Sequence, residues 1–260
     1  MSDEEKIRLG GMALGNGVLV HGPTSWACAV RLPDGQLKVA AKRKWLVVSR
    51  VSRPFLRGPA KLAESFAVLP AVKRALPEAE FPFEQPAIVA AMAASATAVR
   101  ALRGSSLTPA AQELAAGLLS LAPALVLFRS SDVAGYHGAE HISIGSYEHG
   151  EVRAKEHERC GSHLIGPIVA TQAAGQALAV RVPERYRGVA RAAAALGALG
   201  ASTEIFGWMV RHPETKLARA LAKPGHELQH RLATAEPTPE QVEVAEAALR
   251  ACLDLERDAA

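Results

Sequence analysis

Apolar and polar positions give the first third of the chain the pattern of short strands. Apolar runs at 26–32 and 36–41 flank Pro33-Asp34-Gly35, which is typical of the turn in a β-hairpin. A third apolar run, Leu46 to Val51, is a candidate third strand. These runs predict a small antiparallel sheet.

Glycines and one amphipathic stretch complete this part. The segment Gly10 to Val18 is so rich in glycine that it indicates tight turns or close backbone approach rather than a helix. Residues 60–76 show the spacing of an amphipathic helix. We therefore expect residues 1–85 to form a β-containing N-terminal module.

From Ile88 onward the pattern becomes helical and rich in alanine and leucine. Long, weakly polar stretches are each interrupted by charged or amide side chains, and none is a clean membrane span. They fit buried core helices, but weak membrane-embedded or interfacial helices remain an alternative. The stretches are 88–102, 110–128, 164–182 and 188–210.

The last part of the chain carries explicit helix signals. A helix starting at Lys216 is expected to stop at Pro224-Gly225. Thr238 and Pro239 have the residue types of an N-cap and a first helical position, and apolar residues follow at helical spacing. We expect residues 86–260 to form a helical domain, and the whole chain to be one compact α+β protein that is predominantly α-helical.

Composition narrows the classes of partner. The net charge is +4, the charges are evenly spread and aromatic residues are only 5% of the chain, so no nucleic-acid partner is expected. The densest basic run, Lys38 to Arg57, fits a solvated face or contact with anionic lipid headgroups. The sequence indicates neither a substrate nor an oligomeric state.

Cysteine content and the first residues bear on localisation. Three widely spaced cysteines do not make a disulfide framework, which fits a reducing compartment. Residues 1–6 are polar and acidic, with no apolar core behind them, so no signal peptide is expected. We predict a cytoplasmic protein, either free or at the cytoplasmic membrane.

Histidines gather in one short region, which is the strongest chemical signal in the chain. Five of the nine histidines lie within the 27 residues from 137 to 163, together with carboxylates and one cysteine. Imidazole, carboxylate and thiolate are the ligands of zinc and related divalent metals. The histidines are His137, His141, His149, His157 and His163.

The spacing of these residues sharpens the metal hypothesis. His137 and His141 would lie on one face of a helix, and Glu140 completes H-x-x-E-H, the reversed zincin motif, in which the glutamate is a general base. His157 and Cys160 form an H-x-x-C pair. Four such ligands would make a closed structural site, and three plus water an open catalytic one. The alternative is a group of surface histidines without metal, which Gly135 and Gly138 favour because glycine opposes a helix.

Blocks of sequence across most of the chain resemble one known family. They include Gly10-Gly11, Pro54 to Gly58, Tyr136 to His141, His157 to Ser162, Gly200 to Glu204, Leu228-Gln229 and Thr234 to Pro237. This set resembles the YqhQ-like family of uncharacterised bacterial proteins, which carry a domain of unknown function and are described as metal-dependent enzymes. Two positions depart from the family pattern, because Asn16 stands where relatives usually have Glu, and His21 where they have Arg. Family members also resemble multi-pass membrane proteins.

The resemblance adds Glu204 as a candidate ligand. A downstream glutamate is the third ligand of reversed zincins, and Glu204 lies in an otherwise apolar helix. Two ligand sets therefore compete: His137, His141, His157 and Cys160, or His137, His141 and Glu204 with water. Glu148 is the second candidate catalytic carboxylate, and with His163 it is expected to orient the imidazoles.

These observations predict a zinc-type metal-dependent enzyme that performs hydrolysis, with Glu140 as general base and an unidentified substrate. The alternative is a metal-stabilised, non-catalytic binding or assembly protein at the membrane. A third reading is a helical scaffold whose histidines form a hydrogen-bonded cluster without metal.

Overall fold

The computed structural model describes residues 6–48, 51–129 and 131–258. A four-stranded antiparallel sheet comprises β1 (Gly10–Ala13), β2 (Gly17–His21), β3 (Ser25–Arg31) and β4 (Leu37–Arg43), in that order. The predicted hairpin around Pro33-Asp34-Gly35 is confirmed as β3–β4, and Gly35 adopts a φ of +83° that favours glycine. Helices make up most of the remaining chain, so the predicted α+β, predominantly helical class is confirmed.

One predicted strand needs correction, and one glycine-rich segment is partly extended. The segment Gly10 to Val18, for which tight turns or close backbone approach are predicted, contains β1 and the start of β2, joined by a tight turn at Gly15 and Asn16. By contrast, residues 46–48 and 51 of the predicted third strand are irregular. The Glu64 carboxylate accepts a hydrogen bond from the Val48 N–H at 2.7 Å, which ties this segment to a helix instead of the sheet. Residues 49 and 50 lie outside the described part of the chain.

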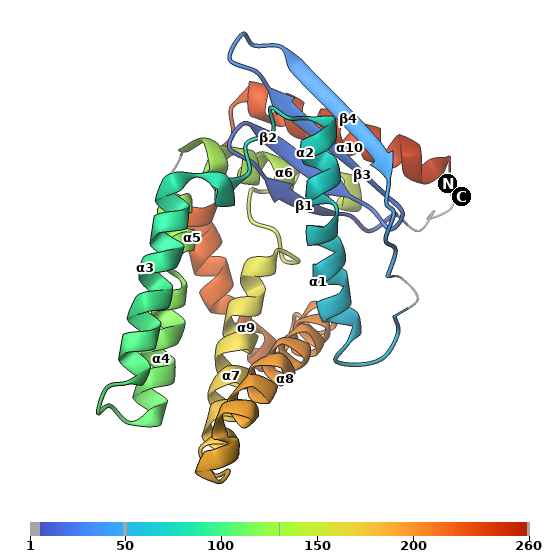
Figure 1. Cartoon of the computed structure of the whole chain (residues 1–260). Helices are drawn as coiled ribbons and strands as arrows, with labels where there is room; N and C mark the ends of the chain where they lie inside the picture. Colours follow the sequence, from blue (N-terminus) through green and yellow to red (C-terminus); the bar gives the residue numbers. More distant parts are fainter. Residues whose placement is uncertain (1–5, 49–50, 130, 259–260) are drawn as a thin grey trace.

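Helices cover both faces of the sheet (Figure 1). On one face, α6 (Ser131–His149) and α10 (Pro239–Arg257) share a core with β1, β2 and β3. On the other face, α2 (Leu69–Ala75) packs over Trp26 and its neighbours, and α1 (Arg57–Ala67) precedes it. The helix predicted over 60–76 is thus broken at Val68. One core therefore contains residues from both predicted parts of the chain.

Two antiparallel pairs among the other helices extend away from the sheet, seen in the lower half of Figure 1. One pair is α3 and α4, and the other is α7 and α8. The stretch predicted at 110–128 is divided at Leu121, because Pro123 lacks the N–H that a continuous helix would use. The bounds are α3 (Pro86–Arg103), α4 (Pro109–Ser120), α5 (Ala122–Leu127), α7 (Ile165–Ala179) and α8 (Glu184–Arg211), with short 3₁₀ turns η1 (Pro82–Glu84) and η2 (Gly161–Leu164).

The C-terminal part corrects one helix end and confirms one helix start. Helix α9 (Lys216–Leu228) does not stop at Pro224 but continues into a π-helical turn, η3 (Gln229–Ala233). Gly225 is required by packing, since a Cβ there would lie 2.5 Å from the Ser162 carbonyl oxygen. The helix predicted to start at Thr238 is confirmed as α10, whose Thr238 and Gln241 form a capping box.

Among the described residues, α8 is the one helix that is long and apolar enough, by length and composition, to cross a membrane on its own. Only 22% of its apolar window is buried within the structure. Residues 1–5, on which the absence of a signal peptide was predicted, lie outside the described residues.

Candidate metal centre

Helix α6 supplies the two central histidines, and its glycines are explained by packing. A Cβ at Gly138 would lie 2.2 Å from the Ala235 carbonyl oxygen, and one at Gly135 would lie 2.4 Å from Gln241 Oε1. Glycine weakens a helix, but here it lets α6 approach the segment before α10. This contact fixes the helix turn on which His137 and His141 stand.

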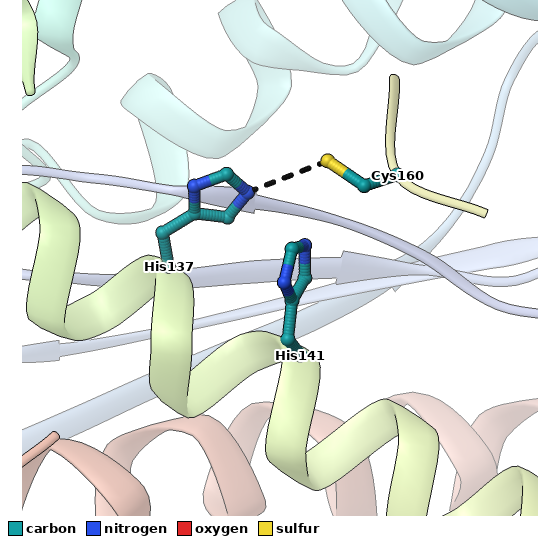
Figure 2. A group of neighbouring side chains, drawn as sticks. All are labelled: His137, His141 and Cys160. Atoms are coloured by element: carbon teal, nitrogen blue, oxygen red, sulfur yellow. Dashed lines mark hydrogen bonds between the residues drawn. The ribbon is translucent and has the colours of Figure 1, made fainter. Parts of the chain in front are cut away.

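His137, His141 and Cys160 meet at one point in space (Figure 2). One ligand atom from each residue lies within 4.8 Å of the other two. The two imidazole centroids are 4.3 Å apart, and Cys160 Sγ lies 3.7 Å from His137 Nε2. Both histidines rise from α6, while Cys160 comes from the loop that precedes η2. Two imidazoles and a thiolate are a donor set that suits zinc.

The hydrogen bonds of the two imidazoles fix their tautomers. His137 Nδ1 lies 2.8 Å from the Ala233 carbonyl oxygen, and His141 Nδ1 lies 2.6 Å from that of Lys155. A carbonyl oxygen only accepts, so each Nδ1 carries a proton, and in the neutral form of such a ring the lone pair is on Nε2. Metal-binding histidines are held in this way. Burial, followed by the neighbouring His137, lowers the pKa of His141, so the ring stays neutral.

The loop that carries Cys160 is held by Gln229, a buried residue of the π-helical turn. Gln229 Oε1 accepts the His157 N–H at 2.9 Å, and its amide nitrogen donates to Ser162 Oγ at 2.6 Å and to His163 Nδ1 at 3.1 Å. The same turn supplies the Ala233 carbonyl that orients His137. The spacing of residues in the sequence does not identify Gln229 as part of the site. The one signal in the sequence is that Leu228-Gln229 is among the blocks that resemble the family.

Glu140 lies beside the three candidate ligands. Its side chain is buried, and Oε2 is 3.6 Å from His141 Nε2, too far for a hydrogen bond. Burial raises the pKa of this carboxyl to about 7, against an opposing effect of His137. Gly11 of β1 lies against it, since a Cβ at Gly11 would be 2.2 Å from Glu140 Oε1.

His157 lies next to this group with both ring nitrogens already engaged. Its Nε2 is 3.3 Å from Glu148, and its Nδ1 accepts the Arg159 N–H at 3.3 Å. The ring centroid is 5.6 Å from that of His141. Glu148 also forms an ion pair with Arg159. The structure thus places the predicted ligand His157 and the predicted carboxylate Glu148 together, where they brace the Cys160 loop.

Glu204 lies on the wall of the same cleft and is paired with Arg57. It also accepts the Phe55 N–H at 3.1 Å. The hydrogen bond from Arg57 lowers the pKa of the Glu204 carboxyl. Glu204 is therefore not one of the three residues that meet at Cys160, although it faces the same space.

The candidate ligands open into a cleft of about 700 Å³. Its walls come from the edge strand β1, from α1, α6 and α8, and from the loop around Cys160. A volume of this size is typical of a site for a small molecule or a short segment of chain. If the three candidate residues held an ion, it would lie beside a cleft that a substrate or water can reach.

Fold and site together define an α+β protein with a His-His-Cys group and a buried carboxylate at one end of a cleft. The chain belongs to the DUF1385 family of proteins of unknown function, whose family model matches residues 125–255, half of the chain. The matched region contains the three candidate ligands, Glu140 and Gln229. This match confirms the YqhQ-like resemblance, since the two are the same family. No curated protein and no solved structure matches the chain.

Proposed function

We propose that this protein is a metal-dependent hydrolase that binds a divalent ion, zinc by preference, through His137, His141 and Cys160. The observation that carries the proposal is the orientation of the two imidazoles. Both Nδ1 atoms are bound to main-chain carbonyls, so Nε2 of each ring is the atom available as a ligand beside the Cys160 sulfur; His137 Nε2 lies within hydrogen-bonding distance of that sulfur, at 3.7 Å. A hydrogen-bonded histidine cluster without metal would be expected to satisfy both nitrogens of each ring, whereas Nε2 of His141 has no hydrogen-bond partner among the described residues.

The chain's own groups fit the roles that hydrolysis requires. The ion supplies a Lewis acid that lowers the pKa of a bound water. Glu140 is buried at the end of the cleft, forms no hydrogen bond with any described residue, and lies near His141 Nε2. It is placed to take a proton from water during attack and to give it to the leaving group. Glu148 and Gln229 position the loop that carries Cys160.

The substitution Glu140→Gln separates chemistry from metal binding. We expect the variant to retain about one equivalent of zinc, measured by elemental analysis, and to lose hydrolysis of a small aryl ester by at least a hundredfold, since general base catalysis contributes about 10²–10⁴-fold.

Glu204→Gln is the matched control, because Glu204 faces the same cleft but is paired with Arg57. It should keep both metal and most of the activity. Loss of zinc from Glu140→Gln would show that Glu140 is a ligand or a structural group, and full activity in that variant would refute the proposed base.

A second candidate function is a metal-stabilised, non-catalytic binding or assembly protein at the cytoplasmic membrane. The observation that favours it is the apolar surface of the projecting helices, where Leu118, Leu178, Val189 and Leu196 are each more than 60% exposed. A cleft of about 730 Å³ between α4 and α7 is also mostly apolar. Exposed apolar surface on this scale marks a site for a membrane or a partner.

A further inference from the structure

The strand nearest the candidate metal centre has an open edge. β1 is the end strand of the sheet, and no described strand pairs with it on the side away from β2. Leu14 donates its N–H to the Gly17 carbonyl at 2.8 Å, which fixes the residues of β1 that bond to β2. By the alternation of an antiparallel ladder, Gly11 and Ala13 direct their N–H and C=O groups away from β2; Gly11 is exposed at this edge, whereas Ala13 is buried.

This open edge reaches the candidate catalytic carboxylate. Gly11 is exposed and lines the cleft, and it lies directly against Glu140. Glu140 is more than nine-tenths buried and has no hydrogen-bond partner among the described residues. Two consecutive glycines, Gly10 and Gly11, weaken a strand, but they allow another backbone to approach closely. The exposed edge of a strand can pair with another extended chain. An unpaired edge beside the Glu140 carboxylate is therefore a candidate binding site for such a chain.

The remaining walls suit an extended chain. Apolar side chains of α1, α6 and α8 also line the cleft, among them Leu62, Ile144 and Phe206. An extended peptide presents main-chain groups to one side and alternate side chains to the other. The cleft offers a strand edge for the main-chain groups of a peptide and apolar walls for its side chains. A small rigid substrate would not use the strand edge.

We propose that the substrate is an extended polypeptide segment that pairs with the outer edge of β1, so that the protein is a metallopeptidase. This inference rests on the proposed hydrolase function. Water adds its oxygen to the scissile carbonyl carbon while Glu140 takes one of its protons. The C–N bond then breaks, and the proton passes from Glu140 to the leaving nitrogen, which yields a carboxylic acid and an amine.

The test is cleavage of a peptide library made by digestion of a whole bacterial proteome, with zinc-loaded full-length protein. We expect cleaved peptides, detected by mass spectrometry, that are absent with Glu140→Gln. One cleaved peptide is then resynthesised with an N-methyl group at each residue in turn, away from the scissile bond. Strand pairing predicts a period of two: methylation at alternate residues should reduce kcat/KM at least tenfold, while methylation at the residues between should change it by less than about threefold.

The same N-methyl series should show the same period in binding to zinc-loaded Glu140→Gln, measured by fluorescence anisotropy. A uniform or irregular effect would overturn pairing with β1. If the protein hydrolyses the aryl ester in a Glu140-dependent way but cleaves no peptide in the library, the hydrolase function stands and the polypeptide substrate is refuted. If neither reaction occurs, the proposed function itself fails.

Discussion

Gln229 is a buried residue that supports the candidate site without being one of the three candidate ligands. Its side chain is fully buried and bonds to the main chain of His157 and to the side chains of Ser162 and His163. These contacts join the loop before η2 to the turn whose Ala233 carbonyl orients His137. A single amide therefore aligns the cysteine and one histidine of the proposed ligand set.

We expect Gln229→Leu to weaken zinc binding about 10–100-fold, the usual cost of losing a group that orients metal ligands. The buried N–H of His157 would also lose its acceptor, which should lower the free energy of unfolding by about 1–3 kcal/mol. Competition with a chromogenic chelator measures the first effect and urea unfolding the second.

Gln112→Leu is the control, because Gln112 donates a hydrogen bond to the Ser105 carbonyl far along the chain from the candidate ligands. It should leave zinc affinity unchanged. Equal zinc affinity in Gln229→Leu and in the parent protein would show that the Cys160 loop does not need this amide.

The sequence could predict some of these residues and not others, for a physical reason. His137 and His141 are four apart, so the helix alone brings their rings together. Cys160 was a candidate because its residue type and spacing suit a metal. Gln229 is 72 positions from His157, and no local pattern reveals a contact of that length. The pairing of Glu204 with Arg57, 147 positions apart, is hidden from sequence spacing in the same way.

At the scale of elements, the buried carboxylate of Glu256 links α10 to the sheet through hydrogen bonds. Glu256 accepts hydrogen bonds from the N–H and hydroxyl groups of both Thr24, in the β2–β3 turn, and Ser25, the first residue of β3. Burial acts to raise the pKa of this carboxyl, but the hydrogen bonds outweigh it and hold the pKa below its ordinary value of 4.5. The folded protein thus favours the ionised form.

A depressed carboxyl pKa has a defined effect on stability. The contribution of Glu256 is fully present above the unfolded-state pKa, near 4.5, and is lost as the pH falls through the lower folded-state value. We expect Glu256→Gln to lower the free energy of unfolding at pH 7 and to flatten its decline below pH 4.5. Urea unfolding at a series of pH values measures both.

Glu246→Gln serves as the comparison, because the one ion pair of Glu246 among the described residues is an exposed one, with Arg250 on the same helix. It should change stability by less than about 1 kcal/mol at pH 7. If the free energy of unfolding falls as steeply below pH 4.5 in Glu256→Gln as in the parent protein, the proposed contribution of the Glu256 carboxylate to stability is contradicted.

Elements with strong local signals were predictable, and those defined by packing were not. Thr238, Pro239 and Gln241 specify the start of α10 within four residues. In contrast, Gly10 and Gly11 have low strand propensity and become part of β1 only because β2 pairs with them. Likewise, Pro224 lies inside α9, where contact of the helix with the Cys160 loop outweighs the local preference to stop.

At the scale of the whole molecule, the two projecting helix pairs give the protein an apolar end opposite the sheet (Figure 1). We predict that the protein floats with vesicles of phosphatidylethanolamine and phosphatidylglycerol in a density gradient. Replacing Leu178, Val189 and Leu196 with serine should greatly reduce flotation without unfolding the protein, because all three side chains are exposed.

Val152→Ser is the control, since Val152 is 89% exposed but lies in the loop after α6, away from these helices. It should float like the parent protein. If the parent protein stays at the bottom of the gradient, or if the triple variant floats equally well, membrane association through these helices is refuted.

The acceptors that orient the two histidines are main-chain carbonyls, at Ala233 and Lys155. Every amino acid supplies the same carbonyl, so a mutation at either position changes the side chain and leaves the acceptor in place. Sequences can therefore drift widely around the histidines while the two rings keep their alignment, provided that the backbone path is preserved. If the proposed metal site is present, divergent homologues should retain it long after the neighbouring side chains have changed.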